Sequence, residues 1–197
     1  ARIHVIEPLE SREDRMAARA EVLRGEGRRP YCIPVGGSCG LGNLAVAAAE
    51  RGCRVRALDA SAPAIEHLHE QSSTRGLPIT AARADLRDHV PPPQAFDAVV
   101  SIGLLMFFAC ADARRQLARL QAAVRPGGVA AVNVLIEGTT YLDMFGAEAH
   151  CLFGGGDLRQ AFDGWTLLHD SEQDFAAPRG LVKRFSTLIA RKPQPGA

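Results

Sequence analysis

The chain has 197 residues, 47% of them apolar and 23% charged, which are ordinary values for one soluble globular domain. With 23 basic and 22 acidic residues the net charge is +1, which gives no reason to expect a nucleic acid or an anionic membrane as a partner. We therefore expect a small-molecule partner, and the composition indicates no oligomeric state.

The cysteines number five, an odd count with wide spacing and no C-x-x-C pair. This pattern predicts free thiols in a reducing cytoplasm rather than a disulfide framework or a zinc site. The first 15 residues contain no long apolar run behind a basic end, so they predict neither a signal peptide nor a membrane anchor. We expect a cytoplasmic protein without a metal. The cysteines are Cys32, Cys39, Cys53, Cys110 and Cys151.

The elements predicted in chain order alternate between strands and helices. Residues 1–30 are expected to be a helical lead-in, residues 31–192 the core, and residues 193–197 a frayed tail of one domain. Strands are predicted over residues 31–35, 53–58, 79–84, 96–102, 129–136, 166–169 and 183–190. Helices are predicted over residues 43–51, 62–74, 111–124 and 157–162. This alternation favours an α/β fold with a parallel sheet, and the two late strands suggest an antiparallel edge.

A glycine-rich turn, Gly36 to Gly42, joins the first strand to the first helix of the core. Gly40 and Gly42 also fit G-x-G-x-x-A, so the turn suits either a nicotinamide cofactor or another adenosine compound, or a tight turn with no ligand. Asp59 ends the second strand, where a carboxylate can accept both hydroxyls of a ribose or cap the helix that follows Ser61. Asp85 repeats this position one strand further on.

Five segments of the chain resemble the tellurite-resistance methyltransferases of the TehB type, which are class I S-adenosylmethionine-dependent enzymes. The segments are CGLGNLAVAAAERGCRVRALDAS, FDAVVSIGLLMFF, VRPGGVAAVNVLIEG, FGGGDLRQAFDGW and KRFSTLIARK. The resemblance implies a Rossmann-like, doubly wound α/β fold. Its seven-stranded, mostly parallel sheet has strand order 3-2-1-4-5-7-6 and an antiparallel edge strand. It also implies S-adenosyl-L-methionine as cofactor, bound at the carboxyl ends of strands 1 and 2.

The resemblance further implies a set of cofactor-binding residues. Ala60 packs against the adenine, Asp85 and Leu86 meet its edge, Ser101 lies beneath the methionine portion, and Leu104 opens an apolar wall near the methyl group. The full set is Gly36, Ser38, Gly40, Gly42, Asp59, Ala60, Asp85, Leu86, Ser101 and Leu104.

Two positions in the glycine turn depart from the family's D-x-G-x-G-x-G pattern. Gly36 stands where the family has its acid, and Ser38 stands where it has its first glycine. Loss of one charge-assisted contact of about 1.5 to 3 kcal/mol would weaken cofactor binding roughly 10- to 150-fold. A degenerate, non-catalytic binding module on the same fold is therefore an alternative, and an NAD(P)-dependent oxidoreductase is a second one.

Methyl transfer requires an aligned nucleophile and exclusion of water, but a soft anion needs no strong base. Positive or hydrogen-bonding residues at the pocket mouth would serve a metalloid oxyanion such as tellurite or selenite. Arg184 matches the arginine of the family's closing R-F-x-T segment, where the resemblance implies that it could hold an oxyanion. His150 and Tyr141 lie in an irregular aromatic segment expected beside the sheet edge; a solvated loop histidine and a packed tyrosine are the alternatives for them. We take these three as the candidate catalytic residues.

Overall fold

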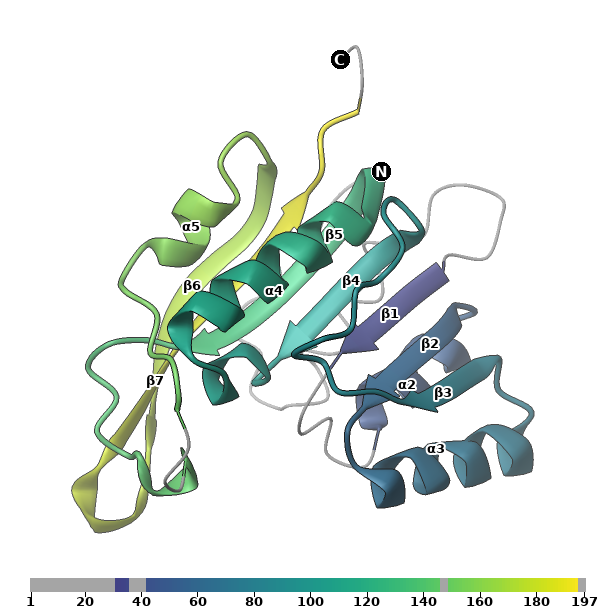
Figure 1. Ribbon diagram of the computed structural model, residues 1–197, viewed down its shortest axis with the longest axis horizontal. Coiled ribbons are helices and arrows are strands. Elements are labelled where there is room, and N and C mark those ends of the chain that lie inside the picture. The colour runs from purple at the N-terminus through teal and green to yellow at the C-terminus, as the bar shows by residue number, and fades with distance from the viewer. Residues whose placement is uncertain (1–30, 36–41, 146–148, 195–197) are drawn as a thin grey trace.

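The structure is a computed structural model that describes residues 31–35, 42–145 and 149–194. The described residues form one seven-stranded sheet in the order β3-β2-β1-β4-β5-β7-β6 (Figure 1). Neighbours among the first five strands pair in parallel, whereas β7 runs antiparallel to both β5 and β6. The predicted α/β class with a mixed sheet is confirmed, and the antiparallel strand lies just inside the edge strand. The strands are β1 (Tyr31–Val35), β2 (Arg54–Asp59), β3 (Ile79–Arg83), β4 (Phe96–Ile102), β5 (Val124–Leu135), β6 (Thr166–Ala176) and β7 (Val182–Arg191).

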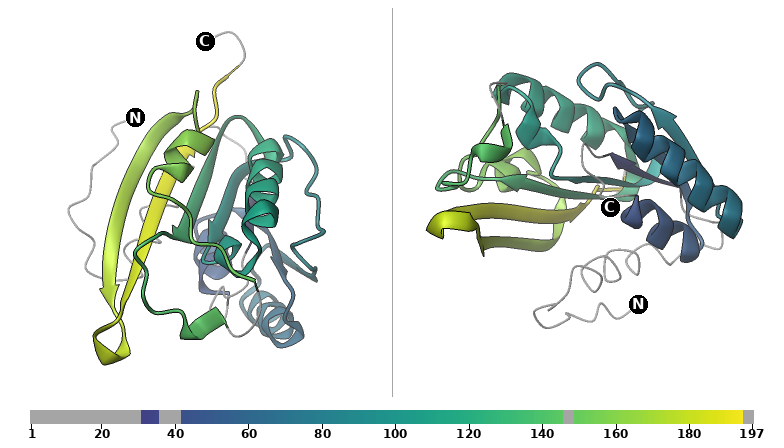
Figure 2. Two further views of the ribbon diagram at one scale, coloured as in Figure 1. Left: turned by 60° about the vertical axis from the view of Figure 1, so that its left-hand side comes forward. Right: turned by 90° about the horizontal axis from the view of Figure 1, so that it is seen from below.

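Helices cover both faces of the sheet (Figure 2). Along β4, Ala98 packs in a core cluster with α2 and α3, and Val99 packs in a second cluster with α4 and α5, because successive strand side chains point to opposite faces. Among the described residues no helix is long and apolar enough to cross a bilayer. The helices are α2 (Asn43–Glu50), α3 (Ala62–Arg75), α4 (Cys110–Ala123) and α5 (Asp157–Ala161), with single turns η1 (Leu105–Phe107), η2 (Asp143–Phe145) and η3 (Pro178–Gly180).

Local signals set where the helices begin and end. The Ser61 hydroxyl caps α3 by accepting a hydrogen bond from the Ala64 amide at 3.4 Å, and Gly76 ends the helix with φ +61°. Gly52, with φ +89°, ends the turn after α2 and lets the chain enter β2. The predicted lead-in over residues 1–30 lies outside the described residues.

Two strands differ from the predicted ranges by several residues at one end. β5 begins at Val124, directly after α4, so the turn residues Pro126 to Gly128 lie within the strand. β6 extends to Ala176. The sequence did not predict this length, because β6 is an edge strand whose residues are nearly all exposed and therefore show no alternation of apolar and polar residues.

The prediction of free thiols is wrong for two cysteines. Cys110 and Cys151 form a disulfide across a sequence separation of 41 residues, with Cα atoms 4.7 Å apart. Spacing along the chain could not reveal this pair, because the fold brings the two segments together. Cys32 and Cys53 are buried free thiols, and the hydrogen bond that the Cys32 thiol makes with the Cys53 side chain, followed by burial, raises the pKa of Cys32. The disulfide removes the argument for a reducing compartment that rested on free cysteines.

Candidate functional site

The carboxyl ends of β1, β2 and β4 meet at one edge of the sheet. Val35, the last residue of β1, lies beside Leu58 of β2 on one side and beside Ser101 of β4 on the other. Asp59 follows Leu58 directly, so the register alone places a carboxylate and a hydroxyl on either side of the β1 end. In open α/β sheets ligands bind outside the carboxyl ends of the strands, at the point where the strand order reverses.

The helix that faces this edge begins at Gly42. This residue has φ +73°, and a Cβ there would overlap the side chain of Leu68 in α3, with Cγ only 2.7 Å away. Glycine is therefore needed for the backbone conformation and for the packing of α2 against α3. The other predicted turn residues, Gly36, Ser38 and Gly40, lie outside the described residues.

Asp59 is 6% exposed, and its Oδ1 accepts a hydrogen bond from the Ser61 amide at 2.8 Å. This contact agrees with the alternative role given for Asp59 above, in which it caps the start of α3. Among the described residues Oδ2 has no hydrogen-bond partner, so one oxygen is left for a ligand. Ala60, beside it, is exposed, and its carbonyl oxygen accepts a hydrogen bond from Arg83 Nε at 3.0 Å.

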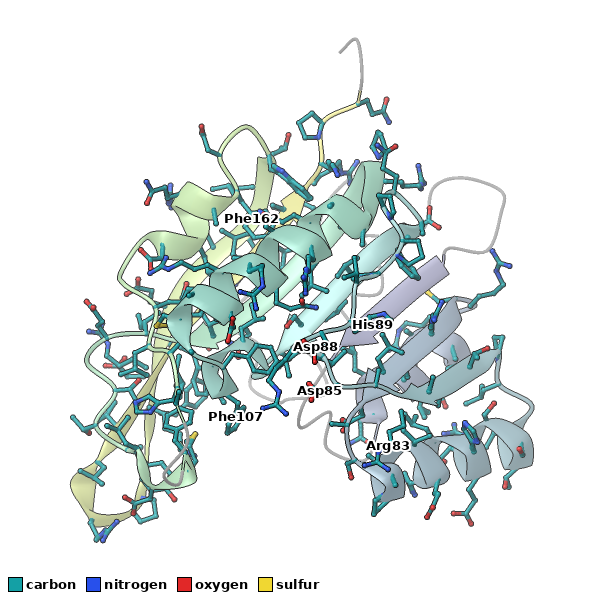
Figure 3. The ribbon with its side chains drawn as sticks, in the orientation of Figure 1. Arg83, Asp85, Asp88, His89, Phe107 and Phe162 are labelled. Carbon is teal, nitrogen blue, oxygen red and sulfur yellow. A yellow bond between two sulfur atoms is a disulfide. The ribbon has the colours of Figure 1, made fainter. Side chains whose placement is uncertain are left out.

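Asp85 lies past the end of β3 and is bound on both oxygens by the Arg87 guanidinium, with Nη2 2.7 Å from Oδ2 and Nε 3.1 Å from Oδ1. This hydrogen bonding lowers the pKa of Asp85 to about 2. Figure 3 shows Asp85 and Phe107 at the same end of the sheet. Leu86 is 3% exposed and packs in the core.

Ser101 is fully buried, and its Oγ finds no hydrogen-bond partner among the described residues. A buried hydroxyl without a partner costs about 1 to 3 kcal/mol, so it points to a group that would satisfy it. The predicted apolar wall follows in η1: Leu104, Leu105 and Met106 are buried, and Phe107 is partly exposed.

The candidate catalytic residues lie on the other side of β4. Tyr141 donates its backbone N–H to the Val182 carbonyl at 3.1 Å, and the Lys183 ammonium lies 4.7 Å from its ring. Arg184 Nε donates to Asp174 Oδ1 at 2.9 Å, and Nη2 lies 3.7 Å from Glu172 Oε2. Tyr141 and Arg184 therefore both lie at β7, and Arg184 is already paired with acids of β6.

His150 is held by ring contacts rather than by β7. Its ring is exposed and stacks on Phe145, with centroids 4.5 Å apart and an interplanar angle of 7°. Phe145 in turn meets the edge of Phe107 in η1 at 5.4 Å. His150 is thus linked to the wall after β4, whereas Tyr141 and Arg184 are linked to β7.

Sequence reasoning missed Arg87 and His89 in the loop between β3 and β4. His89 Nε2 is buried without a partner among the described residues, and burial, followed by the charge of Arg56, lowers its pKa. The D-x-R spacing of Asp85 and Arg87 was a signal for the ion pair, because in a turn after a strand a side chain can reach the residue two positions before it. No pattern in the sequence marked His89.

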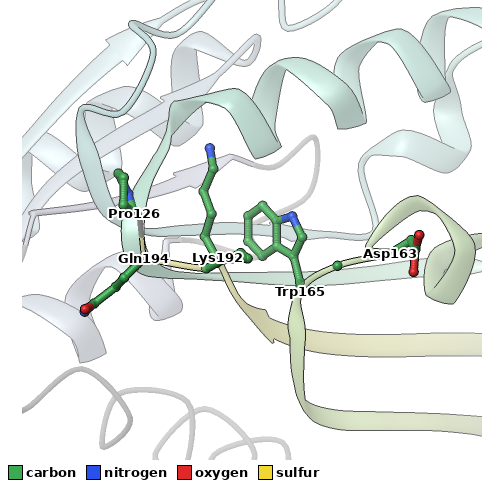
Figure 4. Close-up of a pocket in the computed structure, with 7 residues that line it drawn as sticks. Pro126, Asp163, Trp165, Lys192 and Gln194 are labelled. Carbon is green, nitrogen blue, oxygen red and sulfur yellow. The ribbon is translucent and has the colours of Figure 1, made fainter. Parts of the chain in front are cut away.

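A cavity of about 450 Å³ lies elsewhere, near the amino end of β6 and the end of β7 (Figure 4). Trp165 forms one wall and packs edge-on against Phe162 at 5.0 Å. Lys192 also lines it: its ammonium lies 5.6 Å from the Trp165 ring centroid and donates to the carbonyls of Gln121 and Val124 at 3.0 and 2.9 Å. This cavity contains none of the predicted site residues.

Residues 37–128 match the family model described as a methyltransferase domain. This segment runs from the glycine turn to the start of β5 and contains every candidate cofactor residue except Gly36. A search of the curated proteins found no match for the chain.

Solved structures with this fold include several methyltransferases. TehB from Haemophilus influenzae matches with a TM-score of 0.77 and 18% identity, over 91% of this chain and 62% of the TehB chain. A 1,6-didemethyltoxoflavin-N1-methyltransferase from Burkholderia thailandensis, with bound S-adenosylhomocysteine, matches with a TM-score of 0.64 and 22% identity, over 91% of this chain and 78% of its own. A SAM-dependent methyltransferase from Methanosarcina mazei matches with a TM-score of 0.66 and 14% identity, over 86% and 95%. These matches confirm the predicted resemblance to class I methyltransferases, TehB among them.

Proposed function

We propose that this chain is an S-adenosylmethionine-dependent methyltransferase that acts on a small, soft acceptor, with tellurite and selenite as the first candidates. The register that sets Asp59 and Ser101 on either side of the β1 end carries the proposal. The domain match over residues 37–128, and the S-adenosylhomocysteine bound by the toxoflavin enzyme, support S-adenosylmethionine as the cofactor.

The residues present fit this cofactor. Asp59 offers Oδ2 to a ribose hydroxyl while Oδ1 stays on the Ser61 amide. The orphaned Ser101 hydroxyl can hydrogen-bond the polar methionine end, which would remove the cost of its burial. Asp85 stays ionised at neutral pH, so it can accept a hydrogen bond from an exocyclic amine beside Arg87.

When bound, S-adenosylmethionine supplies a methyl group already activated on a sulfonium. The protein then has to align the acceptor and keep water out. Leu104, Leu105 and Met106 are buried apolar residues directly after β4, and they would exclude water on this side of a bound cofactor. No residue has to remove a proton if the acceptor is an anion.

The acceptor would approach from the side of β7. Arg184 holds Asp174 with Nε and approaches Glu172 with Nη2, which leaves Nη1 as the end of the guanidinium to meet an oxyanion. The Tyr141 hydroxyl and the His150 ring would add hydrogen bonds. We assign these residues to acceptor positioning, in which charge and hydrogen bonding orient the nucleophile.

Two measurements test the proposal. Titration calorimetry with S-adenosylhomocysteine tests the cofactor site, and no heat at millimolar ligand would overturn the methyltransferase assignment. Mass spectrometry then follows the S-adenosylhomocysteine formed from S-adenosylmethionine with tellurite, with selenite, and with sulfate as the control anion. Turnover with tellurite or selenite and none with sulfate is expected. Cofactor binding without turnover would support the cofactor site and reject tellurite and selenite as acceptors.

A degenerate binding module is the second candidate, because Gly36 and Ser38 replace residues of the family's glycine turn. It is distinguished by the double variant Gly36→Asp with Ser38→Gly. In a degenerate module this variant raises the affinity for S-adenosylhomocysteine, whereas an intact enzyme already binds without it. The match to a methyltransferase domain favours both of these candidates over an NAD(P)-dependent oxidoreductase.

A further inference from the structure

The connection between β5 and α5 carries two of the candidate acceptor residues. We call its described residues, 137–145 and 149–153, the acceptor segment. Its first part is held by β7, where the Thr140 amide donates to the Val182 carbonyl at 2.9 Å and the Arg184 amide donates to Thr139 Oγ1 at 3.0 Å. Its last part returns to the sheet, where the Phe153 amide donates to the Leu135 carbonyl at 3.0 Å.

The Cys110–Cys151 disulfide is the covalent tie between this segment and α4. Cys110 is the first residue of α4, three residues after η1 ends. The Cys151 amide also donates to the Met106 carbonyl in η1 at 3.0 Å. Cys151 is therefore held by a hydrogen bond to η1 and by the disulfide to the start of α4. Cys151 is fully buried, whereas Cys110 is partly exposed, so a reductant can approach the bond from the Cys110 side.

The tie also fixes the residue next to it. His150 precedes Cys151 and stacks on Phe145, which meets Phe107 of η1 edge-on. η1 begins four residues after Ser101, which lies near the end of β4. The cofactor side has no such dependence, because Asp59 and Ser101 are placed by strand register.

We propose that the Cys110–Cys151 disulfide is a redox-controlled clamp on the acceptor segment. In the oxidised form it fixes residues 149–153 against α4 and η1. A dithiol reductant gives two electrons and two protons to the S–S bond, which becomes two thiols, while the reductant becomes a disulfide. The segment then loosens and acceptor turnover falls, whereas cofactor affinity is unchanged. The expected fall in turnover rests on the proposed function, whereas the expected loosening of residues 149–153, the structural clause of the proposal, does not.

Amide hydrogen exchange on the full chain tests the structural clause. Non-reducing digestion first has to yield a peptide pair linked through Cys110 and Cys151, and its absence from protein purified without reductant overturns the proposal. Dithiothreitol should then raise exchange at residues 149–153 by about tenfold or more and leave residues 54–59 of β2 unchanged. Equal exchange in the two redox states would overturn the clamp.

Variants separate the clamp from other effects of the reductant. Cys110→Ser should show the fast exchange with or without dithiothreitol, and Cys32→Ser should keep the response of the wild type, because Cys32 lies in the other core cluster. Cys110→Ala offers the same test if the serine variant folds poorly. A Cys110→Ser protein that still responds to dithiothreitol would contradict the proposal.

Turnover is compared between wild type and Cys110→Ser without reductant, since thiols react with tellurite themselves. We expect the variant to lose about tenfold in kcat/KM for tellurite, with S-adenosylhomocysteine affinity within about twofold by calorimetry. Unchanged kcat/KM, or a parallel loss of cofactor affinity, would reject the acceptor-side role. If the wild type itself does not turn over tellurite, the proposed acceptor fails, and the exchange result still decides the clamp.

Discussion

On the proposed cofactor side, Asp59 and Ser101 each lie at or next to the end of a parallel strand, and their positions follow from pairing with β1. On the proposed acceptor side, Tyr141 and His150 lie on a connection whose position depends on hydrogen bonds to β7, a ring stack and a disulfide. The first arrangement is a general property of parallel sheets, and the second is particular to this chain. We infer that cofactor choice resides in the sheet and acceptor choice in the acceptor segment.

The largest effect expected on the cofactor side comes from Gly42→Ala. The substitution should lower the free energy of unfolding by about 2 to 4 kcal/mol, because a left-handed backbone disfavours alanine and the new Cβ overlaps Leu68. Gly52→Ala is the matched control, since Gly52 also has positive φ but its Cβ would meet open space. It should cost only about 1 to 2 kcal/mol. Urea unfolding measures both, and equal losses would mean that the α2–α3 packing does not set the helix position.

Asp59→Asn sharpens the comparison within the cofactor side. The amide oxygen can still accept from the Ser61 N–H, so the fold should persist, but the charge toward the ribose is lost. We expect S-adenosylhomocysteine affinity to fall roughly 10- to 150-fold by calorimetry. Asp85→Asn should cost about fivefold or less, because Asp85 is exposed and already paired with Arg87. A larger effect at Asp85 than at Asp59 would reverse the ranking of the two acids.

The same contrast explains what could be predicted from the sequence. Strand ends, the Ser61 cap and the stop at Gly76 are set by local residue chemistry, so β2, α3 and the position of Asp59 followed from the pattern. On the acceptor side the determining contacts join distant residues. The Cys110–Cys151 bond and the pairing of Arg184 with Asp174 are examples, at separations of 41 and 10 residues.

The edge strand shows a second physical limit. Residues 170–176 alternate neither in polarity nor in burial, because β6 is exposed along most of its length and β7 is its one partner among the described strands. A strand that buries neither face leaves no periodic signal in the sequence. Glu172 and Asp174, which lie beside Arg184, were missed for this reason.

Arg184→Gln tests the acceptor side against the cofactor side. It should lower kcat/KM for the acceptor by about tenfold, through the loss of one charge-assisted contact, and leave S-adenosylhomocysteine affinity within about twofold. Asp174→Asn is the control, because it removes the negative charge beside Nε while an amide oxygen can still accept from Nε and the guanidinium is kept. This control should keep or raise kcat/KM. If Arg184→Gln weakens cofactor binding instead, the division of the crevice into two sides is wrong.

The smallest effect expected concerns the charge of Asp85. Its hydrogen bonds with Arg87 depress the folded-state pKa to about 2, below the ordinary value of about 4. A depressed carboxyl pKa stabilises the folded state above the unfolded-state pKa, and this contribution disappears as the pH falls through about 2. S-adenosylhomocysteine affinity of the wild type should therefore show no step from Asp85 near pH 4. In Arg87→Gln the Asp85 pKa should rise toward about 4, followed by carboxyl ¹³C NMR, and affinity should begin to fall there. An unchanged Asp85 titration in the variant would show that the backbone N–H of residue 87, which also donates to Oδ1, controls this acid rather than the guanidinium.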